Sequence, residues 1–176
     1  MTTTLQSHYT HITCYNFLLK CNFPNIFKIP TITKICLNIG FKEANFSKKK
    51  LINILLLLKL ITNQKPTLTR SKKNIIFLKI KKNSIIGCKI TLRKKKMFFF
   101  FERILLFISP NLKIKNSQNN HILNFQITTV LDFFELKTEF IKFKELPSID
   151  VSIHTTAKTE KELFILSNSL YLVYKD

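Results

Sequence analysis

The stretch Ile85–Arg93 (IIGCKITLR) alternates apolar and polar residues with the period of two that a half-buried β-strand shows. One face of this strand would carry Ile86, Cys88, Ile90 and Leu92, and the other would carry Lys89, Thr91 and Arg93. The stretch Asp150–Thr156 (DVSIHTT) alternates in the same way. The pattern therefore predicts two strands, the first of them with a cationic outer face.

Four more short runs are rich in β-branched or apolar residues and predict further strands. They are Ile32–Phe41, Thr67–Arg70, Ile75–Lys81 and Ile122–Val130. The polar segment Lys113–His121 is expected to be a loop, and Asn22–Pro30, which carries two prolines, is expected to be a linker.

Longer apolar patterns predict four helices, at residues 8–20, Lys48–Thr62, Lys95–Ile108 and Lys158–Tyr171. Ser47 is expected to cap the second helix, which ends at a turn (residues 63–66) because proline cannot continue a helix. Pro110 closes the third helix, and most of its four consecutive phenylalanines, Phe98–Phe101, are expected in the core rather than stacked on bases. The pattern of Phe133–Leu146 fits more than one kind of element.

These elements predict an α+β fold, with helices packed on one face of a mostly antiparallel sheet. The length of 176 residues suits a single domain. Residues 1–30 would form an N-terminal helix and lead-in, and residues 31–176 would form the α+β core.

Charge is unevenly distributed along the chain. The net charge is +19; residues 1–101 hold 20 Lys and Arg and one acid, Glu43, whereas residues 102–176 hold nine of each. Such an excess attracts polyanions, so nucleic acid is the first partner class and anionic lipid the second. Lysine supplies 26 of the 29 cations and Phe, Ile and Asn are abundant, which is typical of an A/T-rich genome and weakens lysine content as a sign of function.

The sequence lacks the motifs of several kinds of site. The four cysteines, at positions 14, 21, 36 and 88, form no CxxC pair, so we expect reduced thiols and no metal site. No phosphate-binding glycine loop, paired-carboxylate motif or GxSxG is found, and His154 lacks a nucleophile and an acid at readable spacing. No run of about 20 apolar residues, the length that spans a bilayer, is present. We expect a non-enzyme without cofactor and without membrane insertion.

Four segments carry a family resemblance. They are IPTITKICLNIG (Ile29–Gly40), ITNQKPTLTRSKK (Ile61–Lys73), IGCKITLRKKKMFFFFERI (Ile86–Ile104) and DVSIHTTAKTEKE (Asp150–Glu162). In order and spacing they resemble the large-ribosomal-subunit protein 5 family, which binds 5S rRNA in the central protuberance. Both glycines of the chain, Gly40 and Gly87, fall inside these segments, which suggests positions that tolerate no Cβ.

The resemblance implies a structural constituent of the large ribosomal subunit. It places rRNA contacts on Asn38, Gln64, Lys65, Thr67, Thr69, Arg70, Ser71, Lys72, Lys73, Lys89, Thr91 and Arg93. Lys and Arg would neutralise phosphates, while Asn, Thr and Ser would donate hydrogen bonds to phosphate or 2′-OH oxygens. The loop Asn74–Ser84 resembles the segment that reaches toward peptidyl-site tRNA, with Lys79, Lys81 and Lys82 as contacts. Neighbouring ribosomal proteins and a small-subunit head protein are further implied partners.

Two departures from the family leave alternatives open. The family's Ala-Gly-Phe-Lys word is replaced by Ile76-Phe77-Leu78-Lys79, and its glycine-rich loop by residues 116–121. Whether the ribosome contains a 5S rRNA stays open, as do a basic peripheral membrane protein and an accessory RNA-binding module such as part of an intron maturase.

The start of the chain bears on its location. The first 42 residues lack acids, as a mitochondrial presequence does, but they also lack Arg. Because Tyr9–Pro30 resembles the family's own N-terminal helix and lead-in, too little precedes it for a presequence. We expect a mitochondrial ribosome, with the protein encoded in the organelle, and a plastid or bacterial origin as lesser options.

Overall fold

The computed structural model describes residues 4–21, 23, 25–41, 48–77, 80–107, 114–116, 122–128, 130, 133, 136 and 147–172. Six strands form one sheet in the order β2-β3-β1-β6-β5-β4, and every pair of neighbours is antiparallel. The strands are β1 (Ile32–Gly40), β2 (Thr67–Arg70), β3 (Ile85–Leu92), β4 (Ile114–Asn116), β5 (Ile122–Ile127) and β6 (Ile149–Thr155).

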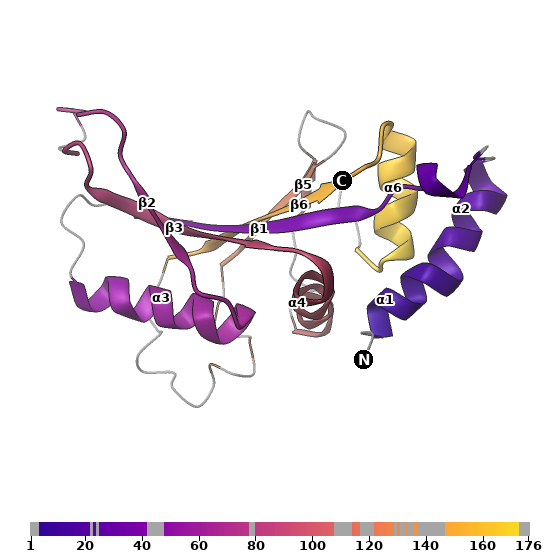
Figure 1. Ribbon diagram of the computed structural model, residues 1–176, viewed down its shortest axis with the longest axis horizontal. Coiled ribbons are helices and arrows are strands. Elements are labelled where there is room, and N and C mark those ends of the chain that lie inside the picture. The colour runs from indigo at the N-terminus through magenta and orange to yellow at the C-terminus, as the bar shows by residue number, and fades with distance from the viewer. Residues whose placement is uncertain are drawn as a thin grey trace.

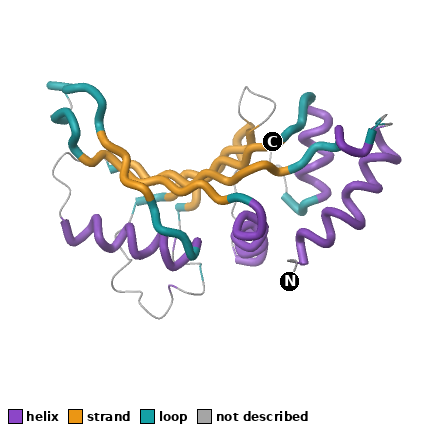
Figure 2. The backbone as a smooth tube through the Cα atoms, in the orientation of Figure 1, coloured by secondary structure: helices purple, strands orange, loops and turns teal. Residues whose placement is uncertain are grey.

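Helices cover one face and one end of this sheet (Figure 1). They are α1 (Thr4–His8), the π-helical η1 (Tyr9–Thr13), α2 (Cys14–Cys21), the 3-10 turn η2 (Ile26–Lys28), α3 (Lys48–Thr62), α4 (Lys94–Phe107) and α6 (Glu160–Ser169). Helices α3 and α4 lie beneath the sheet, whereas α6, α1 and α2 stand together at one end, as the secondary-structure colouring also shows (Figure 2). The predicted α+β class is therefore confirmed.

The core lies between the covered face of the sheet and the helices. Each of four strands supplies alternate buried side chains: Ile35, Leu37 and Ile39 in β1; Cys88, Ile90 and Leu92 in β3; Leu123, Phe125 and Ile127 in β5; Ile149, Val151 and Ile153 in β6. Helix α3 meets them with Ile54, Leu57, Leu58 and Ile61, and α4 with Met97, Phe100, Phe101 and Ile104. The period of two in the strands thus turns every other side chain to the opposite face.

The N-terminal helices are fastened to the body of the protein by polar contacts. Thr4 Oγ1 donates to Glu102 Oε1 of α4, and Tyr9 Oη donates to the carbonyl of Pro30 at 2.8 Å. The ring of His8 lies 5.5 Å from that of Tyr171, between centroids. Burial first, and then the nearby Cys14, raise the pKa of Tyr9, so this phenol stays protonated as a donor.

Helix α6 begins with a capping box. Thr159 Oγ1 accepts from Glu162 N at 3.3 Å, and the Glu162 carboxylate accepts from Thr159 N at 3.4 Å. The predicted final helix is therefore present, although it spans Glu160–Ser169 rather than Lys158–Tyr171. The first helix is longer than expected, from Thr4 to Cys21 across α1, η1 and α2.

Two predicted segments are wrong. The described residues of Ile75–Lys81 form no strand, because Ile75 and Ile80 make only an isolated bridge, and Ile76 and Phe77 lie in a turn. Lys113–His121 is not simply a loop, since Ile114–Asn116 forms β4 against β5. This three-residue edge strand is explained by its pairing with β5 rather than by a residue pattern of its own.

Smaller differences concern a linker, a strand end and a cap. The expected linker Asn22–Pro30 contains η2, where Asn25 Oδ1 accepts from Phe27 N at 3.0 Å. Strand β5 ends at Ile127 and not at Val130. Ser47, Pro110 and most of Phe133–Leu146 lie outside the described residues.

Candidate nucleic-acid interface

One face of the sheet is lined by polar side chains and is not covered by any described segment (Figure 1). We call it the open face. It is formed by Thr67 and Thr69 of β2, Lys89 and Thr91 of β3, Lys34, Cys36 and Asn38 of β1, Asp150, Ser152 and His154 of β6, and Asn124 and Gln126 of β5. Thr67, Thr69, Lys89, Thr91 and Asn38, which are far apart in sequence, are thus brought onto one surface.

The strand register aligns side chains in rows across the open face. One row runs Thr67, Lys89, Asn38, Asp150 and Gln126 from β2 to β5. Facing side chains of adjacent antiparallel strands have Cβ atoms about 4.5–5.5 Å apart, so such a row can follow one nucleic-acid strand. A hydroxyl, an ammonium and an amide stand at its β2 end.

The open face is electrically asymmetric. Asp150, opposite Asn38, is held by Gln126, whose Nε2 donates to Asp150 Oδ1 at 3.0 Å and to Ser148 Oγ at 2.9 Å. The half formed by β2, β3 and β1 carries Lys89 and Lys34 and none of the chain's acids. A polyanion would therefore bind more favourably over this half than over β6, where the Asp150 carboxylate would repel it.

The predicted contact residues differ in how available they are. Six cations have exposed side chains: Lys65, Arg70, Lys72, Lys73, Lys89 and Arg93. Asn38 is also exposed. The Thr67 hydroxyl already donates to the Lys89 carbonyl at 3.0 Å, and Gln64 Nε2 donates to the Thr91 carbonyl at 3.4 Å. Thr67 could then offer a partner only its acceptor lone pairs.

Ser71 is buried and holds the loop between β2 and β3 in shape. Its hydroxyl donates to the Lys81 carbonyl at 2.6 Å, and its backbone N donates to the Ser84 carbonyl at 2.9 Å. This geometry favours a structural role over the RNA contact predicted for Ser71. Lys81 and Lys82 of this loop are exposed, and Lys79 lies outside the described residues.

The two glycines differ. A Cβ on Gly87 would lie 2.5 Å from the Ile39 carbonyl oxygen and 3.0 Å from Thr69 Oγ1, so β3 can approach β1 only without a side chain here. At Gly40, a Cβ would meet nothing within 4 Å, and its φ is not positive. The expectation of a required glycine is confirmed at Gly87 and wrong at Gly40.

A cationic corner forms where the turn after α3 meets the start of α4. Lys96 Nζ donates to the Asn63 carbonyl at 3.2 Å, which ties the turn to the helix. Asn63 and Lys94 both have positive φ, at 50° and 52°. Lys94, Lys95 and Lys96 stand unfavourably at the positive end of the helix dipole, and an anionic partner would relieve this.

The phenylalanine run of α4 packs largely as predicted. Phe100 and Phe101 are buried, whereas Phe99 is exposed and carries the Arg103 guanidinium 4.4 Å above its ring centroid. Arg103 Nη1 also donates to the Ile61 carbonyl at 2.9 Å, so this cation links α4 to α3. It therefore belongs to the helix layer and not to the open face.

Two groups in the sheet have shifted pKa values. Burial raises the pKa of the Cys88 thiol to about 11, which keeps it protonated and unreactive. Partial burial, and then the charge of Lys34 beside it, lower the pKa of His154. His154 is thus neutral at pH 7 and adds no charge to the open face.

The sequence-based site omitted Lys34, Cys36, Ser152 and His154, which share the open face with Asn38. Lys34 and Cys36 could have been found, because they alternate with Asn38 along one strand. Ser152 and His154 could not, since nothing in the sequence says that β6 pairs with β1.

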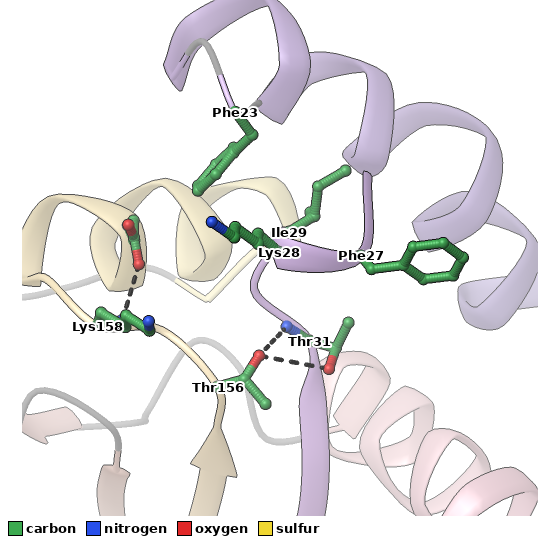
Figure 3. A pocket seen from close by; sticks show the side chains of 8 residues that line it. Phe23, Phe27, Lys28, Ile29, Thr31, Thr156 and Lys158 are labelled. Atoms are coloured by element: carbon green, nitrogen blue, oxygen red, sulfur yellow. Dashed lines mark hydrogen bonds between the residues drawn. The ribbon is translucent and has the colours of Figure 1, made fainter. Parts of the chain in front are cut away.

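A hollow of about 320 Å³ lies at the opposite end of the protein from the loop between β2 and β3, where η2 meets the start of α6 (Figure 3). It is lined by Phe23, Phe27, Lys28, Ile29, Thr31, Thr156, Lys158 and Glu162. Thr31 N donates to Thr156 Oγ1 at 2.9 Å, and Lys158 N donates to Glu162 Oε2 at 2.7 Å. These polar groups hold the chain together at this corner, and none belongs to the predicted RNA contacts.

The described residues form neither a metal site nor a membrane-spanning helix. They contain no cluster of three or more His, Cys, Asp or Glu side chains that could hold a metal ion. They also contain no helix of the length and apolar character needed to cross a bilayer.

Known proteins resemble this chain over most of its length. Residues 25–81 match the family described as ribosomal protein L5, and residues 85–174 match the ribosomal L5P family C-terminus. The large ribosomal subunit protein uL5m of Reclinomonas americana is 35% identical over 169 residues, which cover 92% of each chain.

Bacterial relatives are similar to nearly the same degree. The large ribosomal subunit protein uL5 of Wolbachia sp. subsp. Drosophila simulans (strain wRi) is 34% identical over 149 residues, covering 81% of this chain and 83% of the relative. That of Buchnera aphidicola subsp. Acyrthosiphon pisum (strain Tuc7) is 30% identical over 176 residues, covering 98% of each. The matched segments include all six strands and the open face that they form. The chain therefore belongs to the ribosomal protein L5 family and is a structural constituent of the large ribosomal subunit, not an enzyme.

Proposed function

We propose that this protein binds rRNA through the β2–β3–β1 half of its open face and the basic loop that follows β2. The observation that carries the proposal is the cross-strand row of Thr67, Lys89 and Asn38 on a sheet face that no described segment covers. Exposed cations extend this row at both ends of the β2–β3 pair, at Lys65 and Arg93 on one side and at Lys72 and Lys73 on the other. Shape and phosphate contacts of this kind suit structured RNA.

The mode of recognition follows from the available groups. Exposed Lys and Arg side chains would neutralise phosphates, and Asn38 would donate to a phosphate or a 2′-OH oxygen. Affinity should therefore fall steeply with salt, with a logarithmic slope of about 0.7–0.9 for each neutralised phosphate.

The assignment is tested by replacing Lys72, Lys73, Lys89 and Arg93 with Ala. We expect this variant to be lost from large subunits in gradient sedimentation, because four phosphate contacts disappear. The matched control replaces Lys20, Lys28, Lys158 and Lys161, which are four exposed lysines at the far end of the protein, with Ala. The two variants have the same net charge, so equal incorporation would contradict the site.

We further propose a location in the central protuberance of a mitochondrial ribosome, with 5S rRNA as the partner where one is present. The similarity to a uL5m protein supports the mitochondrial ribosome. The similarity to bacterial uL5 proteins supports a position in the large subunit like that of the rest of the family. Ultraviolet crosslinking of Thr67–Arg93 in purified ribosomes, followed by RNA sequencing, tests this. Crosslinks confined to rRNA outside the protuberance would contradict it.

Finer contacts are proposed from the family resemblance. Lys79, Lys81 and Lys82 in the loop between β2 and β3 would approach peptidyl-site tRNA, and a small-subunit head protein would be met across the subunit interface. The exposed positions of Lys81 and Lys82 support the first proposal. Crosslinking of this loop in ribosomes with and without peptidyl-site tRNA would test it.

A further inference from the structure

The loop between β2 and β3 ends in two consecutive apolar side chains that face solvent. Ile76 is 86% exposed and Phe77 is 95% exposed, whereas Phe100 and Phe101 in the core are at most 2% exposed. A phenylalanine in this position forgoes the stabilisation that burial of its ring would give. Adjacent exposed apolar residues of this size are expected where a partner covers them.

The loop is held firmly below this tip. Ile75 and Ile80 exchange both backbone hydrogen bonds, at 2.9 and 3.1 Å. Lower down, the Ser71 and Ser84 hydroxyls both donate to the Lys81 carbonyl, at 2.6 and 2.7 Å. Asn83, with a φ of 67°, turns the chain back into β3. These hydrogen bonds shape the described part of the loop, which projects at the end of the protein away from α2 and α6 (Figure 1).

The charges around the tip indicate its partner. Lys72, Lys73, Lys81 and Lys82 are exposed below it, and residues 71–84 contain no acid. Cations beside an exposed aromatic ring match an unpaired stretch of RNA, which offers phosphates to the lysines and base faces to the ring. A paired helix offers no free base face, so the aromatic tip favours unpaired nucleotides.

We propose that the tip is a stacking finger, in which Phe77 packs on an unpaired base of RNA while the surrounding lysines bind the flanking phosphates. This inference rests on the proposed rRNA function and adds a base contact to it. The position of the aromatic is particular to this chain, since Phe77 stands where the resembled family's Ala-Gly-Phe-Lys word has its glycine, one position before that word's own phenylalanine.

The chain contains no tryptophan, so Phe77→Trp introduces a single indole, whose fluorescence can be excited apart from that of the four tyrosines. The probes are a hairpin RNA with an unpaired loop and the fully paired duplex of its stem. We expect the hairpin to quench the indole fluorescence and the duplex to quench it much less. Phe27→Trp is the matched control, because Phe27 is also 95% exposed but lies on η2, with its ring pointing away from Lys28 (Figure 3). It should not be quenched.

Affinity gives an independent measurement. Phe77→Ala should weaken hairpin binding about 5- to 150-fold, because stacking on one base contributes about 1–3 kcal/mol. Phe77→Tyr should keep the affinity, and duplex binding should change little in either variant. Because Phe77 is exposed, these substitutions should leave the circular dichroism spectrum unchanged.

The possible outcomes separate the two proposals. If the unmodified protein binds neither RNA, both the proposed rRNA function and the proposed stacking finger are contradicted. If hairpin binding persists without quenching at Phe77→Trp, or with equal quenching at Phe27→Trp, only the finger is overturned. A blue shift of the indole with phosphatidylserine vesicles but no response to RNA would overturn it in favour of a membrane contact.

Discussion

Gly87 shows how one residue decides whether the open face can form. Its missing Cβ lets β3 lie against β1, with the Ile39 carbonyl oxygen only 2.5 Å from where that atom would be. Gly40, paired directly with Gly87 across the strands, has free space instead. The two positions therefore form a natural matched pair.

Gly87→Ala should lower the free energy of unfolding by about 1–3 kcal/mol, because backbone must shift to admit the new atom. Gly40→Ala should change it by no more than about 0.5–1 kcal/mol, because the new atom has free space and alanine reduces the conformational entropy of the unfolded chain. Urea denaturation followed by circular dichroism measures both. Similar losses at the two positions would show that the close approach is not what matters.

At the scale of single residues, alternation predicted side-chain direction well. It placed Lys89 and Thr91 on the outer face of β3 and Cys88 in the core, and the structure agrees. It could not tell that the Thr67 and Ser71 hydroxyls are used within the fold, because their acceptors belong to Lys89 and Lys81, far along the chain.

At the scale of elements, the pairing of β1 with β6 sets the edge of the cationic half. Asp150 stands opposite Asn38 and places a carboxylate next to the proposed path of the phosphates. The sequence assigns Asp150 to a strand but gives no sign of this neighbour.

Asp150→Asn should raise RNA affinity several-fold at low salt, because a like charge is removed while the amide can still bond to Gln126. The gain should shrink as salt screens the repulsion. Glu160→Gln, an equal charge change on exposed α6 far from the open face, is the control. Filter binding over a range of salt concentrations measures the effect, and equal gains in both variants would refute a local role for Asp150.

Strands and helices with a strong pattern of their own were predicted within a few residues, including β2 and α3 with the observed bounds. The strand predicted at Ile75–Lys81 was wrong because an apolar run has the pattern of a strand whether or not a partner strand exists. Strand β4 was missed for the opposite reason, since three residues inside a mostly polar segment become a strand only beside β5.

At the scale of the whole molecule, the two family matches contribute strands to a single sheet. Strand β3, from the second match, lies between β2 and β1 from the first. Separating the two parts would therefore expose the core on both sides of β3. This supports the prediction of one domain.

We expect one cooperative unfolding transition in urea. Circular dichroism would follow the backbone, and thiol labelling would follow Cys88, which is buried and has a raised pKa in the folded protein. A variant with Cys14, Cys21 and Cys36 replaced by Ser isolates that signal. Two separate transitions, or labelling of Cys88 before the loss of secondary structure, would argue for two domains.

The sequence by itself determined the charge excess, the side chains of each strand that face the core, and the family. These follow from local periodicity and from residues adjacent along the chain. Only the tertiary structure decided which strands are neighbours, and hence that Lys89, Asn38 and Asp150 form one row. It also decided that a Cβ is excluded at Gly87 and not at Gly40, and that Phe77 faces solvent. The reason is physical: burial, close approach and the pairing of charges depend on residues brought together by folding from distant parts of the chain.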